Sequence, residues 1–190
     1  SNIPDSTKSR KPVKEKIAII SGIMPVVIIL DLITKRWALS ALSGGPRIEL
    51  FGGLIPLTLA FNRGAAFGLS LGNNPRWFFI PITVLALILL IVLLTQAQAR
   101  DWLRFVSVSL VISGALGNLY DRVRWNRGVV DFIGPIDLGV MHWPIFNVAD
   151  MAISGGAVLL AVSFWREEQR ERLSSAESGD GAVAPEPEGG

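Results

Sequence analysis

Four long apolar segments, separated by polar stretches, dominate the sequence pattern. A helix that crosses the hydrocarbon core of a bilayer needs about 20 mostly apolar residues. Segments of this length lie at residues 17–39, 77–95, 102–120 and 145–165. The second is the most uniform, because residues 77–94 carry no charged side chain. The pattern therefore predicts an integral membrane protein, mainly α-helical, with four transmembrane helices in one domain.

The connections after the first and third spans, at about 44–70 and 122–140, differ from the spans in pattern. Arg47–Phe51 and Leu54–Asn62 flank a Gly-Gly pair, which is typical of a hairpin turn. Gly128–Ile133 also matches a strand and could join the hairpin. Because open sheet edges cannot face lipid, we expect a small β-sheet cradle on the outer surface, with a short outer helix or loop.

Polar tails flank the spans. Residues 1–16 are polar and basic, and residues 166–190 are polar, ending in Ser, Gly, Pro and Glu; we expect both tails to be disordered. No small-residue cleavage site follows residues 17–30, so we expect this segment to be a retained span. Four spans put both termini on one side. Ten Lys and Arg would lie there and eight on the other side, which favours cytoplasmic termini under the positive-inside rule.

Composition narrows the chemistry. Half of the 190 residues are hydrophobic and the mean hydropathy is +0.45, values typical of membrane proteins. The chain has no cysteine and a single histidine, His142, which excludes thiol nucleophiles and zinc motifs with paired histidines. We expect His142 to be an interfacial residue, and we expect no cofactor or metal. The net charge of +2, without a basic stripe, argues against binding to nucleic acid.

Two carboxylates beside apolar segments are the main candidates for chemistry. Asp131 lies between the third and fourth spans, and Asp150 is expected a turn or two inside the fourth. Carboxylates at membrane depth are costly and are usually kept for function. Amide hydrolysis needs a base that activates water and an acid that protonates the leaving amine. Two close carboxylates that share one proton can supply both.

Other polar residues occur at helical spacing, so that each pair shares a helix face. These pairs are Asp31 with Lys35, Asn118 with Arg122, and Asn147 with Asp150. Asn62 ends the hairpin, just before Gly64. We expect Asn147 to orient Asp150, and Asn62, Asn118 or Arg122 to hold a substrate carbonyl or the acids. The alternative is that these residues are hydrogen-bonding links between helices. Asp121, which adjoins Arg122 and Arg124, is expected to pair with them.

Five motifs in order resemble those of the bacterial lipoprotein signal peptidase (signal peptidase II) family. They are Asp31-Leu-Ile-Thr34-Lys35, Asn62-Arg-Gly64-Ala65-Ala66-Phe67, Gly114-Ala115-Leu-Gly117-Asn118-Leu-Tyr-Asp121-Arg122, Val129-Val130-Asp131-Phe132 and Phe146-Asn147-Val-Ala149-Asp150. The resemblance covers residues 17–165. Any one motif is weak, but the ordered set, with the two acids 19 residues apart, is specific.

The resemblance implies a four-helix aspartyl endopeptidase of the bacterial inner membrane, with its active site near the outer interface. It implies cleavage of the signal peptide from prolipoproteins just before a cysteine that carries diacylglycerol. Asp131 and Asp150 would be the catalytic pair, and the other polar motif residues, together with Gly64, would bind substrate or support the site. The expected partners are lipid-modified prolipoproteins, membrane lipids and globomycin-like inhibitors, and the expected state is a monomer.

Two other functions fit the same residues. A small proton-coupled transporter or channel would use intramembrane acids as a relay, and would tolerate loss of Asp131, which lies outside the spans. A non-catalytic assembly factor would use the polar residues only to link helices. It would keep its function when either aspartate became asparagine.

Overall fold

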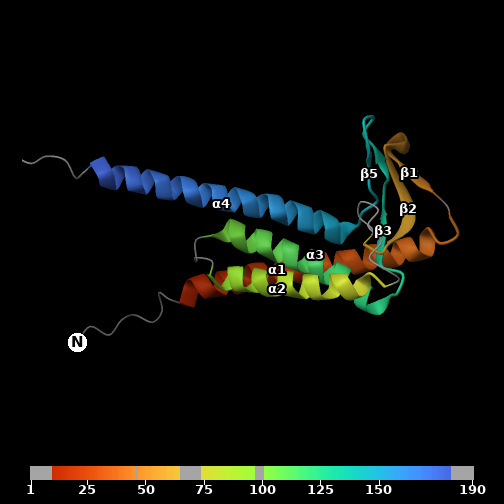
Figure 1. Cartoon of the computed structure of the whole chain (residues 1–190), viewed down its shortest axis with the longest axis horizontal. Helices are drawn as coiled ribbons and strands as arrows, with labels where there is room; N and C mark the ends of the chain where they lie inside the picture. The colour runs from red at the N-terminus through yellow and green to blue at the C-terminus, as the bar shows by residue number, and fades with distance from the viewer. Residues whose placement is uncertain (1–9, 46, 65–73, 97–100, 181–190) are drawn as a thin grey trace, which may run out of the picture.

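Four long helices and a small sheet make up the structure, a computed structural model that describes residues 10–45, 47–64, 74–96 and 101–180. The helices are α1 (Arg10–Ala41), α2 (Arg76–Gln96), α3 (Trp102–Arg124) and α4 (Val148–Asp180). They run roughly along one long axis, and the sheet closes one end (Figure 1). Each helix has a segment long and apolar enough to cross a membrane, as the sequence predicts. The start of α1 and the end of α4 lie at the end away from the sheet.

Helix α3 is the central packing element, since α4, α1 and α2 all pack against it. Glycines allow the closest of these approaches. A Cβ atom at Gly114 would lie 2.3 Å from the backbone oxygen of Ala149, and one at Gly156 would lie 2.7 Å from that of Ser107. By contrast, a Cβ atom at Gly155 would meet no other part of the described chain within 4 Å. Small residues thus bring α3 and α4 together, as expected for helices in lipid.

The main sheet is antiparallel, with β2 (Ile55–Asn62) between β1 (Ile48–Leu50) and β3 (Val129–Ile133). A short 3-10 turn, Phe51–Gly53, joins β1 to β2. The predicted hairpin and the predicted third strand are therefore confirmed. Two further short strands, β4 (Ile136–Asp137) and β5 (His142–Trp143), form a separate hairpin.

A small apolar core fastens the sheet to α1. Ala38 of α1 and Leu42, just beyond its end, pack with Leu57 of β2 and Phe132 of β3, and all four side chains are buried. Side chains alternate across a strand, so Asp131 points away from Phe132 and its core. This packing fixes the position of Asp131 relative to the helices.

Several boundaries differ from the sequence prediction, and α3 itself continues to Arg124, four residues beyond the predicted span and into the predicted outer region. Helix α4 begins at Val148, rather than at 145, because Phe146 bridges Ile133 of β3 and keeps the preceding residues extended. Asp150 therefore lies in the first turn of α4, not one or two turns inside it. At the other end, α4 continues to Asp180, so residues 166–180 are helical where we expected a disordered tail. Pairing of Glu168 with Arg172, one turn apart at 2.6 Å, supports this extension. Likewise, α1 begins at Arg10, within the expected N-terminal tail.

Candidate active site

The first turn of α4 is built around a reciprocal cap. The Asn147 side-chain oxygen accepts the Asp150 backbone N–H at 2.8 Å. In return, the Asp150 Oδ2 accepts the Asn147 backbone N–H at 3.2 Å. This is the geometry of a capping box, with an asparagine at the cap and an acid three residues later. The sequence spacing predicts that Asn147 and Asp150 share a helix face. The two residues do contact each other, but through the cap, because Asn147 precedes the helix.

Asp31 of α1 binds the same helix end from outside. Its Oδ1 accepts the Ala149 backbone N–H at 2.9 Å, and its side chain is fully buried. Free N–H groups at a helix start favour a negative partner. Asp31 therefore ties α1 to the turn that carries Asp150.

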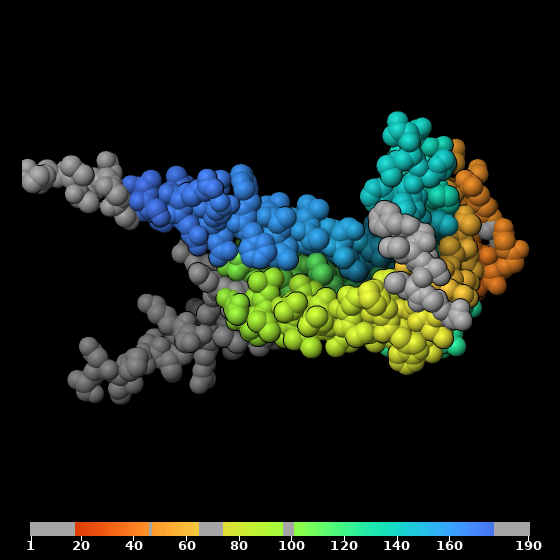
Figure 2. Space-filling model, viewed as in Figure 1, coloured from red at the N-terminus to blue at the C-terminus, as the bar shows by residue number. Residues whose placement is uncertain are grey.

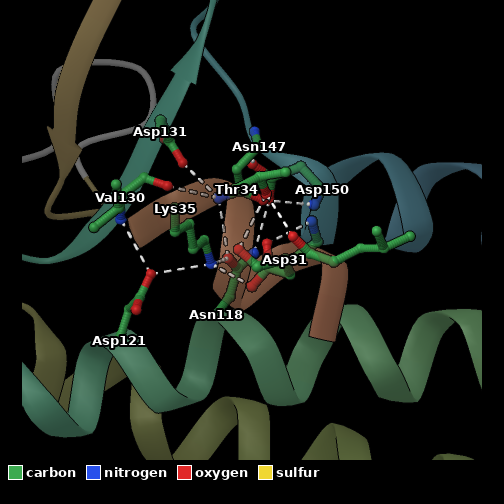
Figure 3. Close-up of polar contacts among 11 residues, drawn as sticks. Asp31, Thr34, Lys35, Asn118, Asp121, Val130, Asp131, Asn147 and Asp150 are labelled. Atoms are coloured by element: carbon green, nitrogen blue, oxygen red, sulfur yellow. Dashed lines mark hydrogen bonds and ion pairs between the residues drawn. The ribbon is translucent and has the colours of Figure 1, made fainter. Parts of the chain in front are cut away.

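Lys35 is the cation at the centre of the polar cluster (Figure 3). Its ammonium lies 2.8 Å from Asp31 Oδ2, 3.0 Å from Asp121 Oδ2 and 3.1 Å from Asn118 Oδ1. An ammonium has three protons, so these three oxygens can satisfy it fully in a site where it is only 3% exposed. Asp31 and Lys35 lie on one helix face, as the spacing predicts, and they form an ion pair. Asp121 pairs with Lys35, in contrast to our expectation that it pairs with the adjacent arginines.

Two asparagines connect this cluster to the two candidate acids. Lys35 can only donate, so the oxygen of Asn118 must face it and the Asn118 amide N–H must point the other way. That N–H donates to Asp150 Oδ1 at 2.8 Å. Asn147 is fixed in the same manner, because its oxygen accepts from a backbone N–H. Its amide nitrogen lies 2.6 Å from Asp131 Oδ1.

Asp131 is a buried acid on β3. Its side chain is 2% exposed, and strand pairing sets it opposite Ala60 of β2. Burial, followed by the charge of Asp150, raises the pKa of Asp131 to about 6, although hydrogen bonds from Asn62 and Asn147 and the charge of Lys35 act in the opposite direction. The structure thus brings Asp131 and Asp150 together on Asn147, close enough to influence each other electrostatically.

Asp150 is the more accessible of the two acids. It lines a cavity of about 450 Å³ together with Trp143, Phe146, Met151 and Ser154. Figure 2 shows a hollow between α2 and α4, with α3 at its floor. A water molecule or a substrate can therefore reach Asp150 from this mainly apolar cavity. Phe146 belongs to the fifth motif, but the sequence does not predict the other residues that line this cavity with Asp150, because single side chains near a span end carry no distinctive sequence signal.

The remaining predicted residues lie around this centre. Asn62 ends β2, and its side-chain oxygen accepts the Gly64 backbone N–H at 2.8 Å. Gly64 has a φ of +90°, and a Cβ atom there would lie 2.0 Å from the Phe79 ring, so only glycine fits. The Arg122 guanidinium lies 5.2 Å from the centre of the same ring. Residues 65–67 of the second motif lie outside the described part of the chain.

His142 lies apart from this cluster, in β5. It is exposed, and its Nε2 is 3.9 Å from an Asp137 carboxylate oxygen. Within the described ranges, no group of three or more His, Asp or Glu side chains could hold a metal ion. The chemical groups that converge are four carboxylates, two amides and one lysine. Asp31 and Asp121 pair with the lysine, which leaves Asp131 and Asp150 for acid/base catalysis on water and an amide.

Comparisons with known proteins identify the family. A family model described as signal peptidase (SPase) II matches residues 23–166. A lipoprotein signal peptidase of Hydrogenovibrio crunogenus is 40% identical over 150 residues, which cover 77% of this chain and 86% of that protein. One from Clostridium tetani is 40% identical over 144 residues, which cover 76% and 90%.

A solved structure described as a bacterial membrane enzyme agrees in fold. It has a TM-score of 0.69 and 32% sequence identity, and the match covers 78% of this chain and 93% of that one. A second, described in the same terms, has a TM-score of 0.71 at 31% identity. The family match spans all four helices and both aspartates, and the chain belongs to the signal peptidase II family of membrane proteases.

Proposed function

We propose that this chain removes signal peptides from diacylglyceryl-modified prolipoproteins, cutting just before the lipidated cysteine, with Asp131 and Asp150 as its catalytic pair. The observation that carries the assignment is the matched support of the two acids. Asp131 accepts a hydrogen bond from the Asn147 amide, and Asp150 accepts one from the Asn118 amide. Each of these two amides is held in a single orientation by a group on its other side. Pre-oriented groups of this kind are what a catalytic site needs.

The pair works through a shared proton. The raised pKa of Asp131, about 6, favours its protonated form relative to an exposed aspartate. With one proton between them, one carboxylate takes a proton from water as it attacks the scissile carbonyl. The other gives a proton to the nitrogen of the leaving amine. The C–N bond breaks, a carboxylic acid and an amine form, and the pair again holds one proton.

The position of Asp150 supports lateral entry of the substrate. The cavity beside it is lined by Trp143, Phe146 and Met151, which suit the apolar signal helix or the acyl chains. The aromatic and aliphatic side chains on the outside of α2, among them Phe78, Ile82 and Leu85, are exposed. A substrate can thus reach the acids from the bilayer without leaving an apolar environment. We propose that a globomycin-like peptide inhibits by filling the same cavity, and that the monomer is the active unit.

The deciding experiment measures processing of a lipid-modified prolipoprotein by the wild type and by Asp131→Asn and Asp150→Asn. Both variants should insert and fold but should lose at least about a thousandfold in cleavage rate, because an amide can neither accept nor share the proton. Asp137→Asn, an exposed acid on β4, is the matched control and should process normally. Normal processing by either site variant would remove that residue from the pair.

The transporter and assembly-factor alternatives make different predictions for the same variants. A transporter would show flux driven by a pH gradient, and an assembly factor would keep its function when the acids are neutralised. Neither receives support from the family match, which is to a peptidase along residues 23–166.

A further inference from the structure

A second cavity lies between α1 and α3, and most of its lining lies outside the site of the proposed reaction. Its volume is about 280 Å³, and its lining includes Arg36 and Ser40 of α1 and Arg124 of α3, with Trp125 just beyond α3. These residues lie at the sheet end of the two helices, where a span meets an aqueous interface. Arginine and tryptophan are favoured at that depth.

An apolar slot continues from this cavity along the same two helices. It has a volume of about 400 Å³ and is lined by Ile28, Leu116, Leu119 and Val123, among others. Leu32 and Tyr120 line both spaces, so the polar cavity and the slot are contiguous. A polar end at the interface followed by an apolar slot at membrane depth has the shape and polarity of a lipid site.

The charged side chains around the cavity indicate which class of lipid the site would bind. Lys35 and Asp121 also line the polar cavity, but they are paired with each other, and Lys35 is paired with Asp31 as well. Within the described part of the chain, neither Arg36 nor Arg124 forms an ion pair with a carboxylate. Asp31, Asp121 and Lys35 together carry a charge of −1, and Arg36 and Arg124 add +2. The five side chains therefore have a net charge of +1, which one phosphate monoanion would balance.

The geometry of Arg124 supports a fixed anion site. Its side chain donates to the Tyr120 hydroxyl, and its guanidinium lies 5.6 Å from the Tyr120 ring centre and 4.6 Å from that of Trp125. Stacking against two rings holds the guanidinium plane in place and leaves other N–H groups free to bind phosphate. Arg36, one helix away, faces the same cavity.

We propose that this site binds one anionic phospholipid of the surrounding membrane, with the headgroup phosphate on Arg36 and Arg124 and an acyl chain in the slot. The diacylglyceryl group of the proposed substrate carries no phosphate, so the two arginines would not favour it. It would also enter elsewhere, because the cavity at Asp150 is lined by α4 and the residues just before it.

Native mass spectrometry of the full chain, titrated separately with phosphatidylglycerol and phosphatidylcholine, tests the proposal. The wild type should bind the anionic lipid about tenfold more tightly, since two interfacial arginines contribute to the preference. Arg36→Gln combined with Arg124→Gln should remove this preference. Arg36→Lys combined with Arg124→Lys should keep most of it. The control, Arg47→Gln, alters an exposed arginine before β1 and should behave as the wild type.

A second variant tests the apolar half of the site. Val123 is exposed and lines only the slot. Val123→Trp should therefore block the acyl chain and lower the affinity for both lipids by about tenfold. Equal affinity of the wild type for the two lipids would overturn the proposal without any variant. So would a preference that survives in the double glutamine variant, or unchanged binding by Val123→Trp.

Discussion

At the scale of single residues, Asp131 destabilises the folded protein when it is charged, a cost that its proposed catalytic role would explain. Burial is the main cause of its raised pKa, and the charge of Asp150 adds to it. A raised pKa means that the folded protein disfavours the charged form. The stabilising contribution is thus fully present below the pKa of the unfolded chain and is lost as the pH rises through about 6.

The raised pKa of Asp131 means that removing its charge should stabilise the folded protein near neutral pH. Asp131→Asn keeps the shape and cannot become charged, so it should unfold at a higher temperature than the wild type at about pH 7.5. The shift from 3.8 to about 6 corresponds to about 3 kcal/mol at most. The difference should shrink as the pH falls to about 3, below the pKa of 3.8 in the unfolded chain, because Asp131 is then mostly neutral in both states. Thermal unfolding in detergent at the two pH values measures it, with Asp137→Asn as the control. Equal melting temperatures at both pH values would contradict this account.

The second prediction concerns the rate. If cleavage needs one proton on the pair, kcat/KM should fall as the pH rises above the pKa of Asp131, about 6 in the free enzyme. The pair titrates as a unit, so the measured value belongs to both acids. A pH profile of cleavage of a lipidated peptide provides the measurement. A rate that stays constant from about pH 5 to about pH 8 would exclude the shared-proton mechanism.

At the scale of elements, the contact between α3 and α4 determines where Asp150 lies. Gly114 and Gly117 of α3 face the first turn of α4 and the Asp31 carboxylate, so α3 serves as the surface on which the active-site turn rests. A methyl group at Gly117 would lie 2.5 Å from Asp31 Oδ2. The small residues in the third motif therefore support the site as well as helix packing.

Gly114→Ala tests this contact. The new Cβ would lie 2.3 Å from the Ala149 backbone oxygen, so α4 must shift by a substantial fraction of an ångström. We expect a loss of about 1–3 kcal/mol in stability from overpacking, and a larger loss of cleavage than of folding. Gly155→Ala is the matched control, because nothing lies within 4 Å of its Cβ position. Thermal unfolding and a cleavage assay, run in parallel, separate the two effects.

At the scale of the whole molecule, the helix order and the sheet could be predicted from the sequence, because long apolar runs and a Gly-Gly hairpin have strong local signals. The start of α4 could not, since a bridge from Phe146 to Ile133 of β3 delays the helix. Neither could its length, because Arg104 of α3 pairs with Glu167 beyond the expected span. Such long-range contacts have no counterpart in local pattern.

The sequence predicted which residues form the polar cluster better than it predicted which of them pair with each other. Helical spacing joins Asp31 to Lys35, as the structure shows. Asp121 was misassigned because sequence neighbours on a helix point in different directions. Its Oδ2 instead reaches Lys35 and, at 3.2 Å, the Val130 backbone N–H. Spacing from Asn118, three residues earlier on α3, was the signal that places Asp121 on the correct face.

The arrangement of the helices predicts how the protein is oriented in the membrane. The start of α1 and the end of α4 lie together, opposite the sheet, and we propose that this end is cytoplasmic. The chain has no cysteine, so a single introduced cysteine can be labelled without background. Val140→Cys, 95% exposed beyond the sheet, should react with a membrane-impermeant maleimide in intact spheroplasts. Ala176→Cys should react only after lysis. The reverse pattern would invert the proposed topology.

The cap on α4 has a consequence for local opening of the structure. The first amides of a helix usually lack partners and exchange their hydrogens with water quickly. Here the amides of Ala149 and Asp150 are held by Asp31 and Asn147. We expect both amides to exchange as slowly as amides inside α4. Asp31→Asn should raise the exchange rate of the Ala149 amide most. Site-resolved hydrogen–deuterium exchange measures both effects. This first turn of α4 would then open only when α1 and α4 separate, so that its rigidity depends on a contact between two residues 118 apart in sequence.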